Sequence, residues 1–276
     1  MKCKIPDSRL TTLDEHNDFY GSEAKPKEIF GESTSAYVAF FEAAKELAPE
    51  AYDLRNILIN IWQPYALEHS WTMPDGFEVH IKVMESISTS IKVPELNSSF
   101  THIFTDNVGQ EKGLSLVANA VHSTDAMVLR EVNRRCNYSE QELQRCLKIL
   151  ATDKRPRIPL GLVDKTEMVM LSHIDSINIS SIKHMSINFI TRLEDLIVRV
   201  LQNIPFEIVC VHDEYKAHAN NMNVVRYWYK EILAELADSH IMQNIIRQIT
   251  GNPNIALQRA SEDLGDIIRK SNYALA

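Results

Sequence analysis

The sequence predicts a mostly helical α+β protein built around a small antiparallel sheet. Apolar residues recur at helical spacing through residues 34–69, and apolar and polar residues alternate through residues 71–106, as they do in half-buried strands. A third segment, residues 206–215, is an apolar, β-rich run whose last part contains the tripeptide His-Asp-Glu. Together these patterns predict a few short strands surrounded by helices.

Composition limits the class of protein. The chain has 276 residues, of which 45% are hydrophobic and 24% charged, which is enough to bury a core in one domain or two. Its four cysteines have no C-x-x-C spacing, so we expect reduced thiols in a cytosolic protein rather than disulfides or a zinc site. No apolar run approaches the ~18 residues of a membrane span. We therefore expect a cytoplasmic protein (in the host cytoplasm if it is viral) with no membrane partner.

The first half of the chain alternates helices and strands. Residues 1–35 are polar and predict a short helix fragment and a loop. Pro49 divides residues 34–69 into two helices, whose apolar stripe is typical of core rather than of a cofactor site. Residues 71–106 predict strands, the first two of which are joined by a Pro-Asp-Gly turn at residues 74–76 with a structural role.

The second half is mainly helical. Helices are predicted for residues 113–135, 139–150, 176–203 and 223–250. Gly-Asn-Pro at residues 251–253 ends the last of them. That last segment is predicted to be one long helix.

The apolar run that leads to Asp213 is the most informative feature. With Pro205 before it and charge after it, residues 206–211 predict a buried strand that includes Cys210. A carboxylate at the end of a buried strand needs a compensating charge, and a metal ion is the usual one. The alternative is a solvated turn after an ordinary core strand.

Several segments, taken in order, resemble one enzyme family. They are Phe19-Tyr20-Gly21-Ser22, the hairpin at 71–79, Asn119 to Ala126 with its His-Ser-Thr-Asp, the His212-Asp213 hairpin, and the end of the chain with Asp266-Ile267-Ile268 and Tyr273 to Ala276. In this order they resemble the C-terminal part of the single-subunit RNA polymerases of phages and mitochondria. The resemblance runs from residue 19 to residue 276 and implies a right-hand polymerase palm.

The resemblance also implies a domain organisation. Residues 1–35 would be the end of the fingers helix and the following loop, and residues 36–136 the fingers and palm helices with their hairpin. Residues 137–190 would be an insertion, because Asp125 and Asp213 lie 88 residues apart where family members have one helix and a short turn. Residues 191–276 would be the palm, with the catalytic hairpin and the C-terminal tail.

In this family the hairpin Asp binds metal for nucleotidyl transfer. Asp213 matches that Asp, so the resemblance makes it the catalytic and metal-binding residue for two Mg²⁺ ions. The resemblance also places His212 in the catalytic site, where it is expected to pack or hydrogen-bond beneath the turn rather than to bind metal. Glu214 departs from the small or polar residue usual at its position, and His-Asp-Glu is usual in the related DNA polymerases.

The nucleotide-binding part of the family pattern is partly present. Tyr20 with Gly21 resembles the Tyr-Gly that ends the fingers helix and helps to select ribonucleotides. The family's triphosphate-binding Lys and Arg lie eight and twelve residues before that Tyr, where this chain has Thr and Ser. Lys4, displaced by an insertion, or Arg9 could replace them, or a partner could supply both cations.

His122 resembles the family His that contacts the primer–template end in the minor groove. Because Ser123 and Asp125 follow it at the expected start of a helix, the segment could equally be a helix cap, and both roles can coexist.

The second essential Asp of the family lies upstream of the matched region. The resemblance therefore implies a split enzyme in which a second polymerase subunit supplies that Asp, the N-terminal promoter-binding region and the thumb. The other partners would be template DNA, the RNA product and ribonucleoside triphosphates. The net charge of −8 agrees with a partner that supplies much of the nucleic-acid grip. The alternatives are a fragment of a family A DNA polymerase and a non-catalytic structural subunit that keeps the palm fold.

Overall fold

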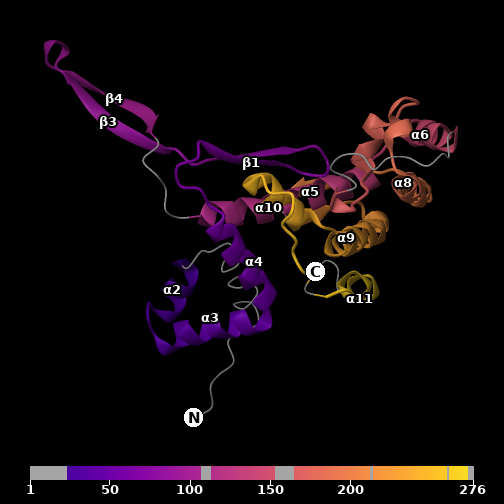
Figure 1. Cartoon of the computed structure of the whole chain (residues 1–276), viewed down its shortest axis with the longest axis horizontal. Helices are drawn as coiled ribbons and strands as arrows, with labels where there is room; N and C mark the ends of the chain where they lie inside the picture. The colour runs from indigo at the N-terminus through magenta and orange to yellow at the C-terminus, as the bar shows by residue number, and fades with distance from the viewer. Residues whose placement is uncertain (1–23, 107–112, 153–164, 212–213, 260, 273–276) are drawn as a thin grey trace. The chain divides into compact units, whose positions relative to one another are not determined.

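The structure is a computed structural model of the chain, and it describes residues 24–106, 113–152, 165–211, 214–259 and 261–272. Within these ranges it consists of helices and small antiparallel sheets, which confirms the predicted α+β class (Figure 1). The chain divides into two compact units. The first unit comprises residues 1–71 and 80–122, and the second comprises residues 72–79 and 123–276.

The first unit begins, in its described part, with helices α2 (Ala24–Phe30), α3 (Ser35–Leu47) and α4 (Pro49–Asn60). The Thr34 hydroxyl caps α3 by accepting a hydrogen bond from the Tyr37 N–H at 3.2 Å. Pro49 occupies the start of α4, where its missing N–H is harmless and its fixed φ suits the helix. The predicted division into two helices at Pro49 is confirmed.

The first hairpin lies where the turn chemistry predicts it. Strands β1 (Glu68–Thr72) and β2 (Glu78–Lys82) pair with each other. In the turn, the Met73 N–H donates to the Phe77 carbonyl at 2.8 Å, and the Gly76 N–H donates to the Met73 carbonyl at 2.9 Å. Gly76 has a φ of 80°, which glycine adopts without steric cost.

The second hairpin is longer and more exposed. Strands β3 (Glu85–Val93) and β4 (Ser98–Asp106) pair antiparallel along their whole length, and the 3-10 turn η1 (Pro94–Leu96) lies between them (Figure 1). Every residue of β4 is exposed. Because Ile87 pairs with Phe104 and Ile91 with Phe100, the ribbon has one apolar face, and Ser and Thr dominate the other.

The region predicted as an insertion is part of the core of the second unit. After α5 (Leu114–Cys136), helix α6 (Glu140–Thr152) confirms the helix predicted for residues 139–150. The chain continues through η2 (Leu171–Ser176), η3 (Ser181–His184) and α8 (Ile187–Val200), which forms the helical part of the segment predicted at 176–203. The buried residues that this region contributes include Leu143, Cys146, Leu150, Met168, Met170, Leu171, Ile177 and Ile182.

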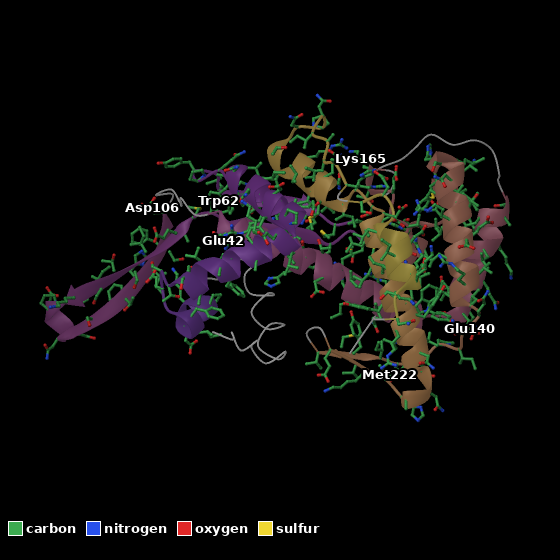
Figure 2. The ribbon with its side chains drawn as sticks, turned by 90° about the horizontal axis from the view of Figure 1, so that it is seen from below. Glu42, Trp62, Asp106, Glu140, Lys165 and Met222 are labelled. Carbon is green, nitrogen blue, oxygen red and sulfur yellow. The ribbon has the colours of Figure 1, made fainter. Side chains whose placement is uncertain are left out.

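The C-terminal part consists of a small hairpin and three helices. Strands β5 (Val209–Val211) and β6 (Glu214–Lys216) are followed by η4 (Ala219–Asn221), α9 (Met222–Ala237), α10 (Ile241–Thr250) and α11 (Leu264–Lys270). Helix α11 lies beside α9 (Figure 1). Figure 2 labels Glu140 and Met222, the first residues of α6 and α9.

The prediction of one helix over residues 223–250 is wrong, because the chain breaks between α9 and α10. The Ser239 hydroxyl donates to the Leu236 carbonyl at 2.7 Å, which closes the last turn of α9. The His240 N–H then donates to the Thr166 carbonyl at 2.9 Å, outside the helix. The predicted stop is confirmed, since Gly251 ends α10 with a φ of 66°.

Candidate active site

The hairpin predicted to bear the catalytic Asp is present. Strands β5 and β6 pair antiparallel, with Val209 opposite Lys216 and Val211 opposite Glu214. The intervening residues, His212 and Asp213, lie outside the described residues. Helix α9 begins at Met222, six residues after Lys216 at the end of β6, and η4 lies between them. The succession of strand, strand and helix around position 213 therefore agrees with the prediction.

The prediction that this strand is buried is wrong. Val209 is 57% exposed and Val211 is 44% exposed. Burial alternates along the segment instead. Its half-buried residues are Phe206, Ile208 and Cys210, and its exposed residues are Glu207, Val209 and Val211. A fully buried strand is covered on both faces, whereas this two-stranded sheet is packed on one face only.

The packed face of the hairpin lies against helices α5 and α9. The Phe206 N–H donates to the Cys136 carbonyl at the end of α5, at 2.9 Å. The rings of Tyr215 on β6 and Tyr229 on α9 meet edge to face with centroids 5.6 Å apart. These contacts attach the hairpin to the helical core.

The two cysteines near this face, Cys136 and Cys210, have thiols with raised pKa values. Burial raises the pKa of the Cys136 thiol to about 12, and the neighbouring Cys210 thiol adds to that effect. Burial also raises the pKa of the Cys210 thiol. Because the thiolate is the nucleophile and the metal ligand, the raised pKa values make both cysteines weak nucleophiles and weak metal ligands at neutral pH.

The Pro-Asp-Gly turn is held by two arginines of α5. The Arg130 guanidinium donates to both carboxylate oxygens of Asp75, from Nε at 2.6 Å and from Nη2 at 3.0 Å. Arg134 Nη1 donates to the same carboxylate at 3.3 Å. Burial by itself would raise the pKa of Asp75, but the hydrogen bonds and charges of Arg130 and then Arg134 outweigh it and lower that pKa. The turn therefore has the structural role that the sequence predicts.

A second ion pair network, in which the Glu131 and Arg135 side chains are fully buried, joins α5 to α9. Arg135 donates from Nε to Glu131 at 2.9 Å and from Nη2 to Glu235 at 2.7 Å. Glu131 also accepts a hydrogen bond from the Leu171 N–H at 2.7 Å. Burial raises the pKa of Glu131, although the charge of Arg135 opposes the shift. This network fixes the helix on which the hairpin packs.

His122 lies within a helix rather than at its start. Helix α5 begins at Leu114, so Ser123 and Asp125 are too far along it to cap its first turn, and that interpretation is wrong. His122 is exposed and belongs to the first unit, whereas the β5–β6 hairpin belongs to the second. Its proposed contact with the primer–template end stays a prediction.

Other predicted site residues lie outside the described residues. They are Lys4, Arg9, Tyr20, Gly21, His212 and Asp213, together with the C-terminal residues 273–276. In the part of the chain that the structure does describe, no group of three or more His, Cys, Asp or Glu side chains is arranged to hold a metal ion. The predicted metal ligand, Asp213, is not in that part.

Sequence reasoning missed the arginines that organise the site. Glu131 and Arg135 are four residues apart on α5, a spacing that predicts a pair on one helix face. Their remaining partners carry no such signal, because Asp75 and Arg130 are 55 residues apart and Arg135 and Glu235 are 100 apart.

Comparison with known proteins assigns no family: no protein-family model matches the sequence, and no curated protein is significantly similar to it. None of the described helices is both long enough and apolar enough to cross a membrane.

Proposed function

We propose that this chain is the fingers-end and palm part of a DNA-dependent RNA polymerase of the single-subunit type, active together with a second polypeptide. One observation supports the proposal above the others. Asp213 falls between two short antiparallel strands that precede a long helix and pack on another, which is the setting of a palm carboxylate. The order of the sequence motifs supports the same assignment.

In the proposed reaction the 3′ hydroxyl of the RNA attacks the α-phosphate of an incoming ribonucleotide, and pyrophosphate leaves. The Asp213 carboxylate is a hard oxygen ligand of the kind that Mg²⁺ prefers. Bound Mg²⁺ ions would supply charge stabilisation for the attacking and leaving oxygens. Tyr20 and Gly21 would select the ribonucleotide, Lys4 or Arg9 would contact its triphosphate, and His122 would contact the primer–template end.

The hairpin itself favours a second polypeptide. Among the described strands β5 pairs only with β6, so each strand has an edge whose backbone groups are available for pairing. Val209 and Val211 expose apolar surface on the unpacked face. A partner segment that brings the second catalytic Asp would cover this face, and the partner would also compensate for the net charge of −8.

The test is ribonucleotide incorporation on single-stranded DNA with Mg²⁺, using the chain co-purified from its native context. We expect activity only in a complex with a stoichiometric partner. Asp213→Asn should lower that activity about 100-fold or more without dissociating the complex. Asp53→Asn, at an exposed site on α4, is the matched control and should leave activity unchanged.

The alternatives give different outcomes in the same assay. A family A DNA polymerase fragment would incorporate deoxyribonucleotides instead. If the chain is only a structural subunit, the complex that carries Asp213→Asn would keep nearly full activity. That result would contradict the catalytic assignment of Asp213.

A further inference from the structure

A partly open hollow lies beside the candidate catalytic hairpin, within the second unit. Its volume is about 250 Å³, and its lining residues are Leu129, Arg130, Asn133, Arg134, Ile208 and Cys210. Two turns of α5 supply its basic side, and the segment leading into β5 supplies its apolar side. No carboxylate occurs among these described lining residues.

The hollow has an excess of one positive charge. Arg130 and Arg134 share the single negative charge of Asp75, whose side chain is only 1% exposed. The arginine side chains are 25% and 33% exposed, so they reach solvent where the carboxylate does not. Burial raises the pKa of the Cys210 thiol, which therefore stays neutral at the opposite wall.

Hydrogen-bond donors remain available on the exposed side of the two arginines, Arg130 and Arg134. Among the described residues Arg134 directs only Nη1 to an acceptor, first to Asp75 at 3.3 Å and more distantly to Glu131 at 3.9 Å. Its Nε and Nη2 groups keep their hydrogens for a ligand. The Asn133 side-chain amide adds a neutral donor to the same lining.

We propose that this hollow binds one phosphate group of a nucleic-acid strand. A guanidinium matches phosphate oxygens in geometry as well as in charge, and the excess of one positive charge suits a monoanionic phosphodiester better than a phosphate dianion. The assignment to a nucleic-acid strand rests on the proposed function. Cys210 precedes Asp213 by three residues, so the chain allows at most about 11 Å between their Cα atoms. Along one nucleic-acid strand this distance corresponds to about three nucleotides.

The first measurement follows the arginine Nε–H resonances of the full chain by NMR during titration with inorganic phosphate. Ionic strength is held constant with chloride. We expect the Arg134 resonance to shift and saturate. The absence of a saturable shift would overturn the proposal.

The variant Asn133→Asp tests the site without removing either arginine. It adds a negative charge to the lining, and we expect affinity for phosphate to fall about tenfold or more. Asn56→Asp, an exposed change of the same charge on α4, should leave affinity unchanged. Equal losses of phosphate affinity in the two variants would show a general charge effect and would reject the hollow as the binding site.

A single-stranded oligonucleotide without terminal phosphate identifies the source of the ligand. We expect it to shift the same Arg134 resonance and to bind about tenfold more weakly to Asn133→Asp. Binding of inorganic phosphate alone would reject the nucleic-acid assignment. Because no step of this test needs catalysis, the oligonucleotide should bind whether or not the chain is active in synthesis, so failure of the hollow is distinguishable from failure of the proposed function.

Discussion

Arg130 and Asp75 are 55 residues apart in the sequence and are joined by two hydrogen bonds, at 2.6 and 3.0 Å. The planar guanidinium meets both carboxylate oxygens, a geometry that fixes orientation as well as distance. Asp75 lies in the turn of the first hairpin, and Arg130 lies on the helix that supports the candidate catalytic hairpin. This pair therefore anchors the turn to α5.

Replacing Asp75 with Asn should destabilise the fold. The substitution keeps the shape of the side chain but leaves Arg130 and Arg134 without their shared counter-charge, at a cost of about 2 kcal/mol in the free energy of unfolding. Urea denaturation measures this cost. Asp53→Asn should change the same quantity by less than about 0.5 kcal/mol, and similar effects of the two substitutions would contradict the anchor.

The stabilisation from Asp75 should disappear in acid. The pKa of Asp75 in the folded protein is lowered from its ordinary value of 3.8, so the unfolded chain takes up the proton first as pH falls. The difference in unfolding free energy between the wild type and Asp75→Asn should have its full value at pH values above the ordinary pKa of Asp75. It should vanish at pH values below the folded-state pKa of Asp75. Denaturation series at decreasing pH measure it, and a difference independent of pH would refute the ionic anchor.

Glu235 should be essential to the buried network. The Arg135 side chain is fully buried. Glu235→Ala would leave the Arg135 guanidinium with Glu131 as its near counter-charge. We expect a loss of about 3 kcal/mol in the free energy of unfolding, because an undercompensated buried charge is costly. Glu142→Ala breaks an exposed pair with Arg145 and should cost less than about 1 kcal/mol. A loss at Glu235 no larger than that at Glu142 would show that the network is dispensable.

Gly265 should be required for α11 to pack beside α9. A Cβ at this position would lie 2.5 Å from Cγ of Asp238 and closer still to one of its oxygens. Alanine usually stabilises a helix relative to glycine by about 1 kcal/mol, but here it would displace a carboxylate that binds Arg269 at 2.9 Å. We therefore expect Gly265→Ala to lower the melting temperature.

The clash can be separated from other effects by a double-mutant cycle with Asp238→Ala. Once the carboxylate is absent, Gly265→Ala should no longer destabilise the protein and should regain the usual advantage of alanine. Additive losses in the double variant would place the cause elsewhere.

Local sequence patterns predicted most elements correctly where the signal was local. Pro49 marks the start of α4, the turn at residues 74–76 forms the first hairpin, and Gly251 ends α10. The prediction of one long helix over residues 223–250 failed because the break depends partly on a hydrogen bond from the His240 N–H to the Thr166 carbonyl, 74 residues earlier. Helical periodicity continues through such a break and does not reveal it.

The candidate site shows the same limit. The hairpin around position 213 was predictable from β-rich residues and a Pro boundary, but its open face was not. An apolar run has the same composition whether one or two faces are covered, and the exposure of Val209 and Val211 depends on what packs against them.

By itself the sequence determined the α+β class, most helices and hairpins, and the position of Asp213 between two strands, because periodicity and turn chemistry act over a few residues. Only the tertiary structure decided that Asp75 meets Arg130 and that Arg135 meets Glu235. Such pairs form when separate elements present complementary groups at one place. Neither partner's local sequence specifies the other, so the anchor of the first hairpin and the basic hollow beside the β5–β6 hairpin are properties of the folded chain.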